Sequence, residues 1–101
     1  MGALTAVMTE KQLMEAIIEA AGRLGFLCYH TYDARRSPEG FPDLLLLKDE
    51  RCLVYECKTE KGRLGPMQQA LIDAFNTAGI PARIVRPVDL DNVLNELRRA
   101  A

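Results

Sequence analysis

Two short apolar runs with charged residues between them limit most strongly what this chain can fold into. Residues 44–47 are four leucines, and residues 53–55 are a leucine, a valine and a tyrosine. Each run is too short for a buried helix and has the length of a β-strand. The charged residues 48–51 between the runs predict a tight turn. The pattern therefore predicts a β-hairpin.

The length of this turn decides which side chains share a face of the sheet. If Asp49 and Glu50 form a two-residue turn, counting back along the strands places Asp43 opposite Glu56. Opposed side chains lie on one face, about 5 Å apart at Cβ. Lys58 follows Glu56 by two residues, so the period of a strand returns it to that face. A turn one residue longer would separate Asp43 from Glu56.

The pairing of Asp43 with Glu56 raises an electrostatic conflict. Both strands are apolar enough to be buried on both faces, and nearby like charges raise each other's pKa and cost stability. A divalent cation relieves that conflict. Carboxylate oxygens suit Mg²⁺ or Mn²⁺, and the sequence has no His/Cys cluster for zinc. The alternative is a surface hairpin in which the glutamate and Lys58 form an ordinary ion pair.

Three short motifs in this order give the chain a resemblance to a known family. They are Gly40-Phe41-Pro42-Asp43, Glu56-Cys57-Lys58 and Gly65-Pro66-Met67-Gln68. Their order and spacing resemble the PD-(D/E)XK nuclease superfamily and, more narrowly, its VRR-NUC (virus-type replication-repair nuclease) branch. The likeness extends from Glu15 to the segment Arg83-Ile84-Val85 and implies metal-dependent hydrolysis of a DNA phosphodiester.

The resemblance also implies two further site residues. The family carries an acidic residue on its first helix that completes the metal site, and Glu15 matches that place better than Glu10 or Glu19. From periodicity alone Glu15 is an ordinary solvated carboxylate. The family places a glutamine two residues after the proline that opens the next helix, which selects Gln68 to orient a water or a phosphate oxygen. Gln69 is expected to be an exposed helix residue.

The expected division of roles follows. Asp43 and Glu56 bind Mg²⁺ or Mn²⁺, with the backbone carbonyl of Cys57 as a third oxygen and Glu15 reaching the ion directly or through water. The metal activates a water molecule and neutralises charge on the phosphate. Lys58 is flanked by carboxylates that favour its charged form, so it is expected to position the water and stabilise the phosphate.

Two loops supply candidate DNA contacts. One loop enters the predicted hairpin and the other leaves it, so both emerge at the end that holds the carboxylates. Their cations would surround the site, as a phosphodiester backbone requires. The histidine at the end of the first strand could also reach a phosphate. The candidate contacts are His30, Arg35, Arg36, Lys61 and Arg63. Alternatively these are ordinary basic surface loops, partly neutralised by Glu39 and Glu60.

The remaining segments predict the architecture. A capping box at Thr9 and Gln12 predicts a helix to residues 22–24, and residues 25–31 read as the first strand. Pro66 opens a helix that ends at Gly79. A strand at 82–85 and a helix starting at Asp89 or Asp91 follow. The fold class is therefore α/β, in the order α-β-β-β-α-β-α, with a mixed four-stranded sheet flanked by helices. Residues 1–8 are expected to be a flexible tail and 9–101 a single domain.

Length and composition limit the size of the domain, its way of binding nucleic acid and its cellular compartment. The chain has 101 residues and a net charge of −1, so it has one small core and no general basic field for nucleic acid. Its three cysteines read as buried thiols of a reducing compartment rather than as a disulfide framework. No segment reads as a membrane span. We therefore expect a cytoplasmic protein, of a bacterial or phage-infected cell.

The expected function is a structure-specific DNA endonuclease. Small free-standing domains of the VRR-NUC branch resemble resolvases of branched DNA, so a Holliday-junction type of substrate is expected. Two symmetric cuts would require two active sites, which a two-fold homodimer supplies. Candidate interface residues are Met8, Met14, Ile18 and Leu90. The alternatives are a non-catalytic DNA-binding or regulatory module with this fold, and a flap or restriction-type nuclease.

Overall fold

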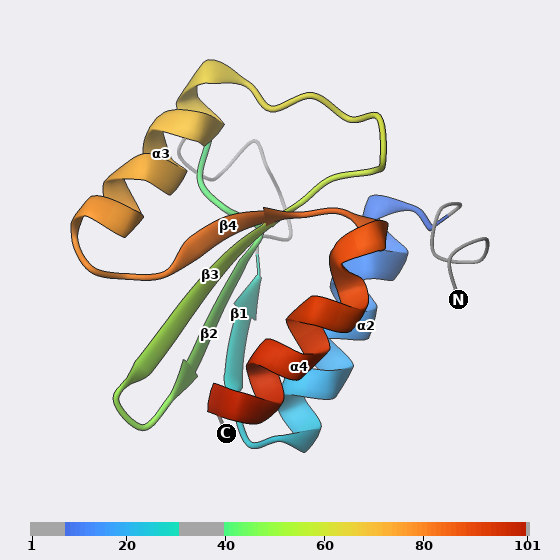
Figure 1. Ribbon diagram of the computed structural model, residues 1–101, viewed down its shortest axis with the longest axis vertical. Coiled ribbons are helices and arrows are strands. Elements are labelled where there is room, and N and C mark those ends of the chain that lie inside the picture. Colours follow the sequence, from blue (N-terminus) through green and yellow to red (C-terminus); the bar gives the residue numbers. More distant parts are fainter. Residues whose placement is uncertain (1–7, 31–39, 101) are drawn as a thin grey trace.

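A mixed four-stranded sheet lies at the centre of the molecule (Figure 1). The computed structural model describes residues 8–30 and 40–100. The strands, in the order β1-β2-β3-β4 across the sheet, are Leu27–His30, Leu44–Lys48, Arg51–Cys57 and Ala82–Val85. The first two neighbouring pairs are antiparallel, and β3 and β4 are parallel. This confirms the predicted sheet and the order of elements.

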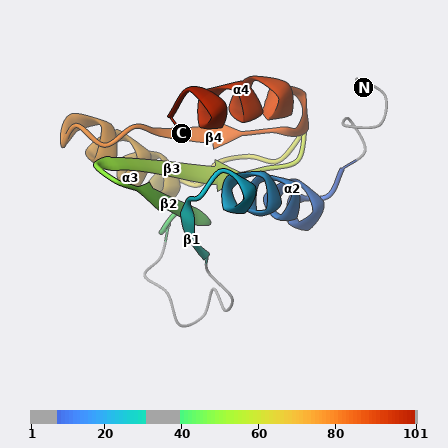
Figure 2. The ribbon, with the colours of Figure 1, turned by 90° about the horizontal axis from the view of Figure 1, so that it is seen from below.

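In the part of the chain that the structure describes, three helices cover the sheet. They are α2 (Glu10–Arg23), α3 (Pro66–Thr77) and α4 (Leu90–Ala100), the last preceded by the short 3₁₀ turn η2 (Pro87–Asp89). Helices α2 and α4 lie side by side on one face, and α3 packs on the other (Figures 1 and 2). None of the helices in the described part of the chain has the length and hydropathy of a membrane span.

The hairpin of β2 and β3 has the predicted register. Lys48 pairs with Arg51, and Leu44 pairs with Tyr55. Asp49 adopts a positive φ of 52°, as the first position of the tight turns that join such hairpins requires. The two-residue turn is therefore confirmed, and with it the parity that places Asp43 and Glu56 on one side.

Local sequence signals and core packing agree in α2. Gln12 N donates to Thr9 Oγ1 at 3.0 Å, and Thr9 N donates to Gln12 Oε1 at 2.9 Å, which confirms the capping box. Leu13 and Ile17 are fully buried against the sheet and α4. Met8, predicted to end a flexible tail, packs against this core. The domain limits otherwise stay a prediction.

The opposite face of the sheet is only partly covered. Ile72 of α3 packs on Val54 and Ala82, which belong to β3 and β4. At the other edge Leu27, Tyr29 and Leu47 are 74%, 60% and 42% exposed. The expectation that both hairpin strands are buried on both faces therefore holds for the second half of β3 and is wrong for the end of β2, where Leu47 lies; Leu45, earlier in β2, is partly buried against the cluster that contains Ile72.

One expected interface residue lies in the core. Leu90, at the start of α4, is 6% exposed and packs in the cluster formed by α2, α4 and the sheet. The turn η2 directs the chain back onto the sheet at this point, so Leu90 faces inward. It is not available to a partner. Met14 and Ile18 are partly buried against the same cluster.

Candidate active site

Asp43 and Glu56 meet at the end of the hairpin opposite its turn. Asp43 N donates to Glu56 Oε1 at 3.2 Å, and Cys57 N donates to Asp43 Oδ2 at 2.9 Å. Asp43 directly precedes β2, and Leu44 is paired with Tyr55. Continuing the register by one residue therefore explains why these two carboxylates are neighbours.

Glu56 is the only charged side chain that is buried in the described residues, at 2% exposed. Burial raises the pKa of Glu56 to about 8; the side-chain hydrogen bond with Asp43 and the negative charge of Asp43 add to this rise, whereas the charge of Lys58 and the hydrogen bond from the Asp43 backbone N–H partly offset it. An ionised carboxylate is costly in such a place. The site therefore favours either a proton or a cation at Glu56.

Lys58 is positioned by the parallel pairing of β3 with β4. It directly follows β3, and its backbone N donates to Val85 O at 2.9 Å. The side chain is half-buried, and its charge is close enough to lower the pKa of Glu56. The structure thus brings Lys58 to the same site as the two carboxylates.

The first turn of α3 brings Gln68 to the site. Gln68 Nε2 donates to Glu56 Oε2 at 2.6 Å, and Gln68 Oε1 accepts from Gly65 N at 2.7 Å. Both the nitrogen and the oxygen of the amide are therefore held by hydrogen bonds. Gln69 is exposed and donates instead to Asp73 Oδ1 at 2.9 Å. Of the two glutamines, it is therefore Gln68 that contacts Glu56, as the sequence motif predicted.

Gly40 explains how α3 comes so close to Asp43. It has a φ of +79°, and a Cβ on Gly40 would lie only 2.6 Å from the backbone carbon of Met67. The segment that leads into Asp43 therefore passes directly against the first turn of α3. Nearby, the rings of Phe41 and Phe75 meet edge to face at 6.4 Å.

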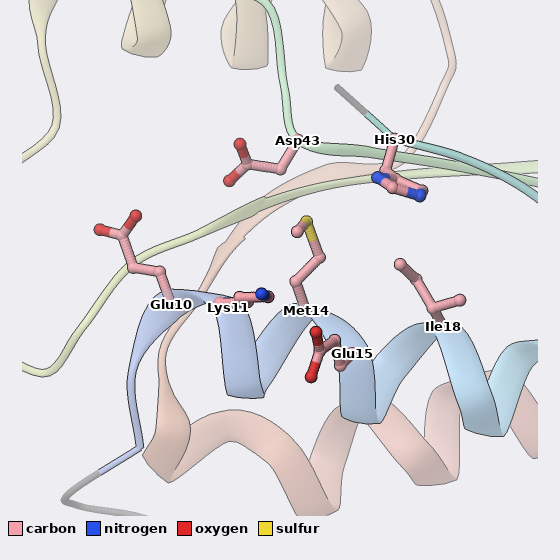
Figure 3. A pocket seen from close by; sticks show the side chains of 7 residues that line it. All are labelled: Glu10, Lys11, Met14, Glu15, Ile18, His30 and Asp43. Atoms are coloured by element: carbon pink, nitrogen blue, oxygen red, sulfur yellow. The ribbon is translucent and has the colours of Figure 1, made fainter. Parts of the chain in front are cut away.

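A groove of about 710 Å³ opens beside Asp43 (Figure 3). It lies between α2 and the ends of β1 and β2, and its walls are both charged and apolar. It is lined by Glu10, Lys11, Met14, Glu15, Ile18, His30 and Asp43. His30 was expected near the site, whereas Lys11 is a cation that the sequence analysis missed.

Two carboxylates of α2 line this groove, and they differ in direction. In Figure 3 the Glu10 carboxylate points from α2 toward the side on which Asp43 lies, whereas the Glu15 carboxylate points away from it. Burial raises the pKa of the Cys57 thiol, and the charges of Asp43, Glu56 and Glu10 add to the rise. The charge of Glu10 is thus felt at the site. The family pattern favours Glu15, and that assignment stays a prediction.

The donor set fits a hard divalent cation. Asp43 and Glu56 offer carboxylate oxygens, and their conflict is the one a cation relieves. Across residues 8–30 and 40–100, no group of three or more His, Cys, Asp or Glu side chains could hold a metal ion. The remaining positions would therefore fall to a backbone carbonyl such as that of Cys57 and to water, which Mg²⁺ readily retains.

The predicted DNA-contacting cations are only partly placed by the structure. Lys61 and Arg63 are exposed on the loop between β3 and α3, which leaves the hairpin at the end that holds the carboxylates. Arg35 and Arg36 lie outside the described residues.

Comparisons with known proteins agree with this geometry. The family model of the VRR-NUC domain matches residues 4–89. A solved structure titled "VRR_NUC domain" is 24% identical, with a TM-score of 0.71, over 87% of this chain and 97% of its own. Another, "VRR_NUC domain protein", is 20% identical, with a TM-score of 0.70, over 90% of this chain and 86% of its own. At these identities the two structures show the fold alone, and a search of curated proteins finds no match. The family model covers most of the sequence, and the chain therefore belongs to the VRR-NUC domain family.

Proposed function

We propose that this protein is a metal-dependent endonuclease that hydrolyses DNA phosphodiester bonds. The observation that carries the proposal is the pair Asp43 and Glu56, held together by backbone hydrogen bonds, with the pKa of Glu56 raised to about 8 beside Lys58. The buried carboxylate of Glu56 and the half-buried carboxylate of Asp43 favour a cation, and next to an ammonium group they supply the charges needed at a phosphate. Membership of the VRR-NUC family supports the nuclease assignment.

The metal would be held by the oxygens already described. Asp43 and Glu56 would be its ligands, with the Cys57 backbone carbonyl as a third donor, and a carboxylate of α2, from Glu10 or Glu15, would reach the ion through a water molecule. Mg²⁺ or Mn²⁺ bound there would lower the pKa of a water molecule and neutralise charge on the phosphate. Because the pKa of Glu56 is raised, a metal ion bound there would compete with a proton for this carboxylate.

Lys58 and Gln68 complete the proposed site. Lys58 stabilises negative charge on the phosphate and helps to place the attacking water. Gln68 fixes the orientation of the Glu56 carboxylate through its 2.6 Å hydrogen bond and lies where its amide can also meet a phosphate oxygen or a water. Lys61, Arg63, Lys11 and His30, with Arg35 and Arg36, are proposed to contact the DNA backbone.

For the substrate we propose branched DNA, cut by a homodimer with one active site in each protomer. The partly uncovered sheet edge supports a dimer, because Leu27 and Tyr29 are exposed there. The three cysteines, all free, are consistent with a reducing cytoplasm. The second candidate is a DNA-binding module without catalysis; the exposed lysines and arginines would support it equally, whereas the pairing of Asp43 with the buried Glu56 does not.

A substrate panel tests the proposal. Labelled four-way junction, flap, linear duplex and single strand are incubated with the protein, with and without Mg²⁺ or Mn²⁺. We expect metal-dependent cleavage, with the junction cut fastest, and no cleavage by Glu56→Gln. Glu19→Gln is the matched control, because it makes the same change of charge at an exposed carboxylate, which is paired with Arg23. This variant should cut as the wild type does. Metal-dependent cutting by Glu56→Gln at the wild-type rate would refute the site, and DNA binding without cutting would favour the second candidate.

A further inference from the structure

We propose that Arg86 is a positioning residue that holds Lys58 against the active site through the loop of residues 59–62. The proposal rests on the function proposed above. Arg86 directly follows β4 and is half-buried. One nitrogen of its guanidinium, Nη1, reaches three backbone carbonyls of a loop more than twenty residues away. They are Thr59 O at 2.6 Å, Glu60 O at 3.3 Å and Gly62 O at 2.7 Å.

The turn that follows β4 holds this loop at a second point. Val88 N donates to Glu60 Oε1 at 2.7 Å, and Arg86 N donates to Asp89 Oδ2 at 2.9 Å. The loop after β3 is therefore tied to the turn after β4 by both backbone and side-chain bonds. A guanidinium suits this role because it presents several donors in a fixed plane.

Gly62 carries the restraint from Arg86 to Lys58. A Cβ placed on Gly62 would lie 3.4 Å from Lys58 Cδ and 3.0 Å from Thr59 Oγ1, so the backbone at Gly62 lies against the stem of the lysine side chain. Gly62 N also donates to Thr59 O at 3.3 Å, which closes the loop on itself. Arg86 holds Gly62, and Gly62 limits where the Lys58 side chain can go.

This restraint addresses a specific weakness of lysine as a phosphate-stabilising group. Its long stem has many rotamers and its ammonium is a point charge, so its position must be imposed by neighbours. The metal ligands do not depend on the loop, because Asp43 and Glu56 are fixed by hydrogen bonds within the hairpin and by Gln68. Arg86 should therefore affect turnover without affecting metal affinity.

The experiment compares Arg86→Ala with Arg83→Ala. Arg83 is the matched control: it lies on β4, which Arg86 directly follows, and forms an ion pair with Asp89 at 3.7 Å, yet it makes none of the three loop contacts. Mn²⁺ affinity is measured by calorimetry, and cleavage of junction DNA by single-turnover kinetics. For Arg86→Ala we expect a rate loss of about tenfold or more with Mn²⁺ affinity within about twofold of wild type. Arg83→Ala should keep both values. A wild-type rate in Arg86→Ala, or an equal loss in Arg83→Ala, would overturn the proposal.

Gly62→Ala tests the link to Lys58 while leaving Arg86 intact. The added methyl presses on the lysine stem and on Thr59, so it should also slow cleavage. If both changes act through Lys58, the double variant Gly62→Ala with Arg86→Ala should lose little more than the slower single variant, whereas independent effects would multiply. Arg86→Lys, which keeps a donor, should recover part of the rate. Multiplying effects, or no recovery in Arg86→Lys, would contradict the proposed path.

A readout without DNA separates this inference from the proposed function. The ε-methylene of Lys58 is observed by NMR in metal-free protein labelled with ¹³C-lysine and is assigned with Lys58→Ala. We expect restricted motion in the wild type and in Arg83→Ala, and increased motion in Arg86→Ala. Equal motion in all three proteins would overturn the positioning role whether or not the protein cuts DNA. Absence of cleavage by the wild type, together with restricted Lys58, would instead refute the nuclease function alone.

Discussion

The Glu56 carboxyl is ionisable and buried, and this combination governs how the metal-free protein responds to pH. Its pKa in the folded protein is about 8, raised first by burial and then by Asp43, whereas an unfolded chain has the ordinary value near 4.5. The folded state therefore binds this proton more tightly. Its contribution to stability is full below about 4.5 and is lost as pH rises to about 8.

We accordingly expect the metal-free protein to lose stability between pH 5 and pH 8, and Glu56→Gln to lose less. At pH 8 the variant should be more stable than wild type by at least about 1.4 kcal/mol, the value of one pK unit. Urea unfolding in EDTA at several pH values measures this difference. Glu19→Gln, which alters an exposed carboxylate, serves as the control. The same pH slope in wild type and Glu56→Gln would show that Glu56 is not the group responsible.

The two carboxylates of α2 give a second prediction at the scale of single residues. Glu10 points to the side of the groove on which Asp43 lies, and its charge reaches Cys57. Glu10→Gln should therefore weaken Mn²⁺ binding by about tenfold, the lower end of the effect of groups that support a metal site. Glu15→Gln is the matched change on the same helix and should have a smaller effect. Calorimetric titration with Mn²⁺ decides between them, and a larger loss in Glu15→Gln would support the assignment made from the sequence.

At the scale of elements, Gly40 holds the segment that leads into Asp43 against Met67, in the first turn of α3 that also carries Gln68. Gly40→Ala would place a methyl group 2.6 Å from the Met67 backbone and on a residue with φ of +79°. We expect a loss of about 1–3 kcal/mol in the free energy of unfolding and a slower cleavage rate, because α3 must move away from the hairpin.

Gly79→Ala separates strain from this clash. Gly79 also has a positive φ, of +86°, but a Cβ there meets nothing within 4 Å. Gly79→Ala should therefore lower the free energy of unfolding without slowing cleavage. Chemical unfolding and single-turnover rates of both variants test the distinction. Equal effects on the rate would mean that the Gly40 contact does not position Gln68.

The hairpin also shows which features a sequence can predict. The turn at Asp49 and Glu50 fixes parity, and parity is enough to place Asp43 beside Glu56. Local signals likewise predicted the capping box at Thr9 and the positions of the four strands. These features depend on neighbours in the chain or on one strand pairing, so periodicity and turn chemistry determine them.

The features that the sequence did not predict depend on how elements pack. Which carboxylate of α2 faces the groove depends on how the helix lies across the sheet, and periodicity gives only its angle relative to Ile17. Leu90 was expected at an interface because it lies near a helix end, but η2 turns it into the core. The three carbonyls that Arg86 contacts lie more than twenty residues away in sequence, and no local pattern marks them.

At the scale of the whole molecule, charge is distributed unevenly although the net charge is −1. Lys61 and Arg63 lie on the loop beside the carboxylate end of the hairpin, whereas Arg98 and Arg99 lie at the C-terminal end of α4, away from that loop (Figure 1). Replacing Lys61 and Arg63 by alanine should weaken DNA binding and reduce the salt-dependence slope by about 2, because two fewer counterions are released.

Replacing Arg98 and Arg99 by alanine is the matched control, since it removes the same charge from the other end. Its slope should stay close to that of the wild type. Fluorescence anisotropy with labelled junction DNA at several salt concentrations, in EDTA to prevent cutting, measures both slopes. An equal change in the two double variants would mean that the DNA is bound by the net charge of the protein and not at the proposed site.

The partly uncovered sheet edge leads to a prediction about assembly. Leu27 and Tyr29 of β1 and Leu47 of β2 are exposed together, which is costly in water unless a partner covers them. A two-fold dimer through this edge would give two active sites for two cuts. Light scattering should show a dimer, and Leu27→Glu with Tyr29→Glu should be monomeric and make single nicks in place of paired ones. Val88→Glu, at another exposed apolar residue (69% exposed), should remain dimeric. A wild-type monomer that stays monomeric on junction DNA would exclude the dimer and favour a nuclease that makes one nick per binding event.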